Sequence, residues 1–161
     1  MYQIDKKDKV IELHELPQSS VGAPIPIVLA DEHTAVVAYY LQESVMSEGI
    51  EVDQVAIVTF KKCRSIMFGP PNDEAFKGHP LADRGLKPYS FFLVEKSSWL
   101  RKLIDMNKVH PYHKDSLFDG YKHYILSFHD SVFECICEEF ELIVSKGTLM
   151  DNFSIMKEKL G

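Results

Sequence analysis

The sequence predicts an α+β fold: a mainly antiparallel sheet of about eight strands, in one layer or two, with one inserted helix and one C-terminal helix. Three observations predict it. Short apolar runs recur along the chain, turn residues separate them, and only two segments have helical spacing. With 161 residues, 45% hydrophobic and 26% charged, the chain is expected to form a single domain, 1–161, with its own core.

The first expected strands are apolar runs bounded by turn residues. They are 10–16, 25–30, 35–42, 52–60, 63–68 and 89–95. The second and third runs flank the polar turn 31–34, which is typical of a hairpin. The fourth and fifth flank Lys61-Lys62 and are expected to form another hairpin.

A hairpin near the C-terminus is expected from runs 121–129 and 132–144, which surround Asp130-Ser131. With a two-residue turn, alternation separates an apolar face from a polar one. The apolar face, expected in the core, pairs Phe128 with Phe133, Leu126 with Cys135, and Tyr124 with Cys137. The opposite face pairs Ser127 with Glu134 and His123 with Glu138.

Two segments have helical spacing. Ser97 and Ser98 are candidate N-caps for a helix that ends before Pro111, because proline disfavours helical angles at the residue before it. Residues 148–151 resemble a capping box. The stripe that follows is expected to dock a C-terminal helix on the sheet, and consists of Leu149, Phe153, Met156 and Leu160.

Composition excludes several classes of protein. The net charge is −6 and the basic clusters are small with acids nearby, so no nucleic-acid binding is expected. The longest apolar run, Ala35–Leu41, is far shorter than a membrane span, and the first residues do not resemble a signal peptide. We therefore expect a cytoplasmic protein without membrane contact. Its three cysteines, Cys63, Cys135 and Cys137, are expected to be reduced and free.

The most unusual stretch is the loop 69–88, which holds three of the eight glycines and four of the eight prolines. Loops of this length inside compact domains are usually functional or disordered. Phe76, Leu81 and Leu86 are expected to anchor it on the sheet, so that it presents polar groups rigidly. The expected ligand-binding residues, with two histidines from the C-terminal hairpin, are Asn72, Asp73, Glu74, His79, Arg84, His123 and His129.

Two functions fit these residues. The first is a non-catalytic module, without a cofactor, that uses the 69–88 loop to bind a small molecule or a protein. The sequence is compatible with a homodimer. The second is a small metal-assisted or acid–base hydrolase. Its candidate catalytic residues are His79, Glu134 and Asp73, and its candidate ligands for a divalent metal such as zinc are His79, His110 and His113. Whether these side chains converge separates the two functions, so whether the protein is an enzyme stays open.

Four short motifs resemble an uncharacterised family of bacterial cytosolic proteins of similar length. They are Gly-Pro-Pro-Asn-Asp-Glu-Ala at 69–75, Gly-His-Pro-Leu at 78–81, Lys-His-Tyr-Ile at 122–125 and Phe-His-Asp-Ser-Val-Phe-Glu-Cys at 128–135. The resemblance spans 68–137, less than half of the chain. It implies a bacterial cytosolic source, and no activity comes with it.

Overall fold

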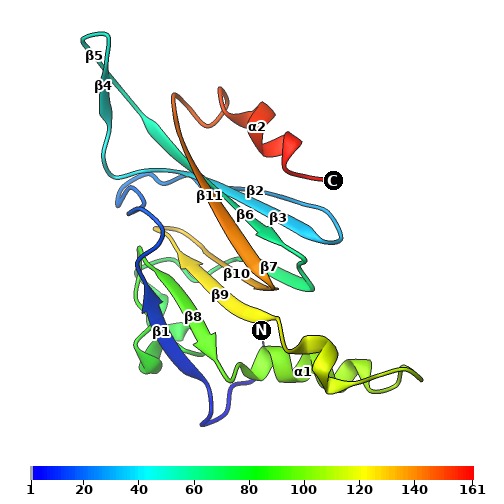
Figure 1. The fold of residues 1–161 in the computed structure, drawn as a ribbon. Coiled ribbons are helices and arrows are strands. Elements are labelled where there is room, and N and C mark those ends of the chain that lie inside the picture. The colour runs from blue at the N-terminus through cyan, green and yellow to red at the C-terminus, as the bar shows by residue number, and fades with distance from the viewer. Residues whose placement is uncertain (1) are drawn as a thin grey trace.

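The protein is an α+β fold in which two antiparallel sheets face each other (Figure 1). The computed structural model describes residues 2–161. One sheet has the order β1-β8-β9-β10-β7, the other has the order β11-β6-β3-β2, and β4-β5 is a separate hairpin. The strands are β1 (Lys9–Leu13), β2 (Ile27–Ala30), β3 (Thr34–Tyr40), β4 (Val45–Ser47), β5 (Ile50–Val52), β6 (Gln54–Lys61), β7 (Ser65–Gly69), β8 (Phe91–Glu95), β9 (Lys122–Ser127), β10 (Val132–Cys137) and β11 (Glu139–Lys146), and the helices are α1 (Ser98–Asn107) and α2 (Phe153–Glu158).

Three apolar clusters hold these layers together. The largest lies between the two sheets and includes Phe60 of β6 and Phe133 of β10. The second lies between the outer face of the five-stranded sheet and the 69–88 loop. The third joins α2 to the outer face of the four-stranded sheet. Both sheets are therefore covered on both faces, which explains why their central strands are buried throughout.

One expected hairpin is wrong. The runs on either side of Lys61-Lys62 do not pair with each other, because the chain leaves β6 in one sheet and enters β7 in the other. The expected single strand 132–144 is divided in the same way, since β10 and β11 belong to different sheets. The two crossings lie side by side, with the Lys62 ammonium 2.7 Å from the Glu138 carboxylate. They close one corner of the sandwich.

The β9-β10 hairpin has the expected faces but a different register. Phe133 lies opposite Leu126, two residues from the predicted partner, because the turn contains four residues, 128–131, instead of two. A slip of two residues keeps every side chain on its face. Leu126, Phe128, Phe133 and Cys135 are buried, as predicted. The polar face is buried as well, because the 69–88 loop covers it.

The β4-β5 hairpin is an addition that the apolar pattern did not indicate. Glu48 and Gly49 form its turn with φ angles of 52° and 79°, which fits a type I′ turn. The hairpin projects from the end of the four-stranded sheet (Figure 1), where Met46 and Ile50 are 66% and 67% exposed.

Both helices lie near their predicted places. Ser97 caps α1 by accepting a hydrogen bond from the Leu100 amide at 3.2 Å, and the helix ends before Pro111. Thr148 and Asp151 exchange capping hydrogen bonds, but the helical turns of α2 start only at Phe153. The predicted docking stripe is confirmed, since Leu149 and Met156 are buried on the sheet. Within residues 2–161, neither helix has the length and apolar composition needed to cross a bilayer.

Candidate functional site

The 69–88 loop is ordered and covers the outer face of the five-stranded sheet, as predicted. Phe76, Leu81 and Leu86 are buried against β8, β9 and β10. Two short 3-10 turns, 76–78 and 82–84, give the loop its shape, and Gly85 ends the second with a left-handed φ of 96°. The loop thereby carries His79 down onto the sheet.

His79 and His123 both bind Glu134. The Nε2 atom of His79 lies 2.7 Å from Oε1 of Glu134, and the Nε2 atom of His123 lies 2.8 Å from Oε2. All three side chains are fully or almost fully buried. Glu134 lies on β10 and His123 on the neighbouring β9, with both side chains on the face that the loop covers. One carboxylate therefore joins the loop to the two central strands.

The contacts at Nδ1 locate the protons of this bridge. The Leu81 amide donates a hydrogen bond to Nδ1 of His79 at 3.1 Å, so that atom carries no proton and Nε2 donates to Glu134. The Tyr2 hydroxyl donates to Oε2 of Glu134 at 2.8 Å. The carboxylate thus accepts bonds from both imidazoles and one phenol, which is nearly its full capacity.

These bonds keep Glu134 ionised. Burial raises the pKa of Glu134, but hydrogen bonds from His123 and His79 outweigh it and lower the pKa to about 2. The pKa of Tyr2 is raised, first by burial and then by the Glu134 carboxylate, so its hydroxyl keeps its proton. The bridge is a fixed buried anion with its donors in place, and it offers no atom to solvent for acid–base chemistry.

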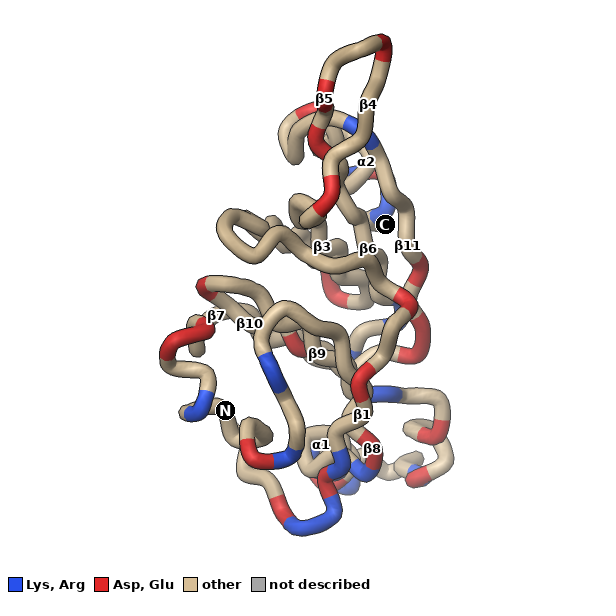
Figure 2. The backbone as a smooth tube through the Cα atoms, turned by 90° about the vertical axis from the view of Figure 1, so that its left-hand side faces the viewer, with Lys and Arg blue, Asp and Glu red and all other residues tan. Residues whose placement is uncertain are grey.

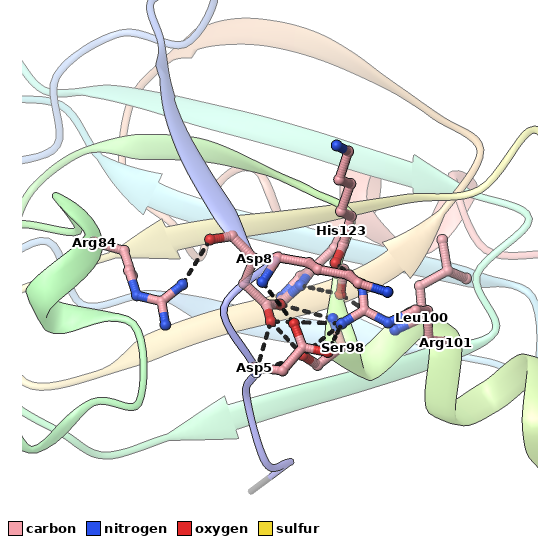
Figure 3. A network of polar contacts seen from close by, with 10 residues as sticks. Asp5, Asp8, Arg84, Ser98, Leu100, Arg101 and His123 are labelled. Carbon is pink, nitrogen blue, oxygen red and sulfur yellow. Dashed lines mark hydrogen bonds and ion pairs between the residues drawn. The ribbon is translucent and has the colours of Figure 1, made fainter.

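The bridge continues to the start of α1. The hydroxyl of Ser97 lies 2.8 Å from Nδ1 of His123, and the same oxygen caps the helix. Beside it, the buried carboxylate of Asp8 accepts a hydrogen bond from the Ser98 amide at 2.7 Å. Figure 3 shows Asp8 among Asp5, Ser98 and Arg101, with Arg84 reaching its carbonyl oxygen from the 69–88 loop at 2.8 Å. The first turn of α1 is therefore held from several sides.

An open pocket of about 400 Å³ lies between α1 and the adjacent ends of β8 and β9. We call it the α1 pocket. Leu100 and Ile104 of α1 and Leu93 of β8 provide its apolar wall. The other residues around it are Lys7, Val94, Glu95, Lys96, Ser97, Arg101, Tyr121, Lys122 and His123. Its size is within the range of small-molecule sites in proteins.

The neutral polar groups of the α1 pocket already have hydrogen-bond partners. His123 uses Nδ1 on Ser97 and Nε2 on Glu134. The Tyr121 hydroxyl accepts a bond from Nε of Arg64 at 2.8 Å. Both ring nitrogens of His123 and the hydroxyl oxygen of Tyr121 are thus already engaged, and an apolar occupant would displace water at little cost.

The rim of the α1 pocket is basic, although the chain as a whole carries a net charge of −6. Its residues include the cations Lys7, Lys96, Arg101 and Lys122 but a single carboxylate, Glu95. Figure 2 shows the lysine-rich segment before β1 at the end of the molecule where α1 and β8 lie, opposite the acidic β4-β5 hairpin.

A second polar cluster is partly open to solvent. The Nδ1 atom of His129 lies 2.8 Å from the Tyr89 hydroxyl and 3.0 Å from the Asp73 carboxylate, to which Tyr89 also donates. The hydrogen bond from Tyr89 is the main reason that the pKa of Asp73 is lowered. Burial and the same contact raise the pKa of Tyr89 to about 12. This cluster ties the 69–88 loop to the β9-β10 turn.

The remaining predicted residues do not join either cluster. Asn72 accepts a hydrogen bond from the Ala75 amide within its own loop at 2.9 Å, and Glu74 is exposed. His110 and His113 contact their own loop after α1, where His113 is bonded to Asn107 and Asp115.

The structure does not bring His79 together with His110 and His113, because His79 is folded onto the sheet while the other two stay in the loop after α1. Within residues 2–161, no group of three His, Cys, Asp or Glu side chains is placed to hold a metal ion. His79 and Glu134 do meet, while Asp73 lies with His129 instead.

The three cysteines are free and buried, as expected. They converge between the sheets, with the sulfur atoms of Cys135 and Cys137 3.9 Å apart. Cys63 bonds the carbonyl oxygen of Phe60 from the β6-β7 crossing. Their position in the apolar core makes them packing groups.

A second cavity, of about 190 Å³, lies where the ends of the two sheets separate. Tyr39 and Phe128 line it, together with Ser19, whose hydroxyl has no hydrogen-bond partner among residues 2–161. It has about half the volume of the α1 pocket and no basic rim, since the charged side chain lining it is Glu12.

No protein-family model, no curated protein and no solved structure matches this chain.

Several residues that build the site are not indicated as site residues by the sequence. Tyr2, Ser97 and Tyr89 each make a central contact, and Leu100 and Ile104 form the wall of the α1 pocket. Periodicity indicates that Leu100 and Ile104 face inward, but it cannot show that a cavity separates them from the sheet. The lysines before β1 were the available signal for the basic rim.

Proposed function

We propose that this protein is a non-catalytic binding module that holds a small, largely apolar molecule in the α1 pocket. The observation that carries the proposal is a cavity of about 400 Å³ with an apolar wall, in which the neutral polar groups are already paired. Such cavities are the usual sites for small ligands.

The 69–88 loop has an indirect role in this proposal. His79 fixes Glu134, Glu134 fixes His123, and His123 bonds Ser97, which caps the helix that carries Leu100 and Ile104 of the pocket wall. The loop therefore supports the binding site through a buried chain of hydrogen bonds. Rigid support of this kind lowers the entropy lost on binding.

A reducing compartment such as the cytoplasm is the proposed place of action. The three unpaired cysteines support it, because thiols stay reduced there.

The hydrolase alternative has less support. Its three histidines do not converge, and the buried bridge of Glu134 has no access to solvent. The Asp73–His129 pair is partly exposed, but in the contacts of residues 2–161 the Nε2 atom of His129 has only the Asp130 carboxylate near it, at 3.9 Å. A binding module does not require that these histidines and carboxylates reach a substrate.

Replacing Ile104 by Trp tests the proposal. The indole should fill the α1 pocket and weaken the binding of octanol, measured by calorimetry, at least tenfold. In the wild type, each methylene removed from the alcohol should weaken binding about fourfold, since burying one methylene contributes about 0.8 kcal/mol. Met106→Trp is the matched control, because Met106 lies on the same helix, is 62% exposed and does not line the pocket.

Ile104→Trp should keep a thermal unfolding midpoint close to that of Met106→Trp, and Leu100→Trp serves as a second blocking variant. Wild-type protein that does not bind octanol, or blocking variants that bind it as well as the wild type, would overturn the proposed function.

A further inference from the structure

Three lysines of the basic rim of the α1 pocket have no ion-pair partner among residues 2–161. Arg101 is already paired with the Asp5 carboxylate at 2.6 Å, and the single acid of the rim, Glu95, is 3.6 Å from Lys9. Lys7, Lys96 and Lys122 are exposed, and none of them has an ion-pair partner among residues 2–161. Three ammonium groups therefore border the apolar pocket, and none of them has a carboxylate within ion-pair distance among residues 2–161.

What distinguishes the rim is that its three lysines gather around one apolar pocket in a chain that is acidic overall; of the twelve other lysines, six are paired with carboxylates within residues 2–161. Lys61, Lys62 and Lys159, for example, lie within 2.9 Å of carboxylates. Like charges that lie near one another repel, and their repulsion is relieved when an anion binds between them.

Taking the two halves of the site together, we propose that the ligand of the α1 pocket is an amphipathic anion. Its apolar chain or ring occupies the space between α1, β8 and β9, and its negatively charged head group lies among Lys7, Lys96 and Lys122. This inference rests on the proposed function and adds the chemical class of the ligand.

The two ends of the ligand are bound by different interactions, apolar burial at one end and charge attraction at the other. The apolar part leaves water for a wall of Leu93, Leu100 and Ile104, whose contribution grows with buried area. The head group stays at the solvent boundary, where ammonium groups attract it and desolvation is small. Carboxylate, sulfonate and phosphate head groups share this chemistry.

Comparing octanoate with octanol tests the charge without changing the chain. At pH 7 and low salt, octanoate should bind the wild type at least tenfold more tightly than octanol, and the difference should shrink as salt is added. The triple variant Lys7→Gln, Lys96→Gln, Lys122→Gln should lose this preference and bind octanol as the wild type does.

A charge-matched control separates the rim from overall charge. The triple variant Lys77→Gln, Lys114→Gln, Lys146→Gln removes the same charge at residues that do not line the pocket, and should keep the preference for octanoate. Acetate, which has the carboxylate but almost no chain, should not bind measurably.

The outcomes distinguish the two proposals. If octanol binds and octanoate binds no more tightly, the amphipathic anion is wrong and the apolar binding function stands. If acetate binds as well as octanoate, the lysines hold small anions without the cavity, and this inference is again overturned. If neither octanol nor octanoate binds, the proposed function fails and the ligand class fails with it.

Discussion

Replacing Glu134 by Ala should lower the free energy of unfolding by about 3–5 kcal/mol. The substitution leaves two buried donors and one partly buried donor without an acceptor: Nε2 of His79, Nε2 of His123 and the Tyr2 hydroxyl. An unpaired buried polar group costs far more than a hydrogen bond contributes on average. Urea unfolding followed by circular dichroism measures the loss.

Glu139→Ala is the matched control, since Glu139 is exposed at the start of β11. It should change the free energy of unfolding by less than about 0.5 kcal/mol. If the two alanine variants were equally stable, the buried bridge would not stabilise the fold.

Acid should weaken the contribution of Glu134 in a defined window. The pKa of Glu134 is lowered from 4.5 to about 2 on folding, so the unfolded chain takes up the proton first as the pH falls. The stabilisation is therefore complete above about pH 4.5 and is lost as the pH falls towards 2. The stability difference between wild type and Glu134→Gln should shrink over this window, and a constant difference would contradict the assignment of an ionised Glu134.

Phe133→Ala should also destabilise the protein by about 3–5 kcal/mol, the usual range for truncating a core phenylalanine. Phe133 is 0% exposed and packs between the sheets, with its ring centre 5.3 Å from that of Phe60. The cavity left behind cannot collapse, because strands on both sides are fixed by their ladders.

Phe68→Ala provides the comparison for Phe133→Ala, because Phe68 lies opposite Phe133 on the edge strand β7 and is 47% exposed. Its loss should cost about 1 kcal/mol or less in urea unfolding. Equal losses for the two variants would mean that the apolar face of β10 is not the core.

The faces of the β9-β10 hairpin could be predicted because alternation has a period of two, and a two-residue slip leaves each side chain on its face. The register could not be predicted, since it depends on a turn of four residues whose sequence, Phe-His-Asp-Ser, does not specify its length. The sheet to which each strand belongs could not be predicted either. The local apolar pattern of β6 and β7 would be the same if they paired with each other as it is with the two strands in different sheets.

The candidate site was predictable only in part, for a related reason. The glycines, prolines and apolar anchors of the 69–88 loop indicate a functional loop, and they make His79 a candidate site residue. Its partner Glu134 is 55 residues away, and Tyr2 is 132 residues from Glu134. No local pattern encodes contacts at such separations. The α1 pocket could not be predicted either. The spacing of Leu100 and Ile104 is the same whether the helix packs directly on the sheet or leaves a pocket between them.

Mapping octanoate on the protein by amide chemical shifts tests the central claim most directly. The largest shifts in a nitrogen–proton correlation spectrum should fall on residues 93–104 and 121–123, which surround the α1 pocket, and should be absent in Ile104→Trp. The smaller cavity between the sheets, near Ser19 and Tyr39, should stay unaffected. Shifts centred on that cavity, or on Asp73 and His129, would contradict the account and place the binding site elsewhere.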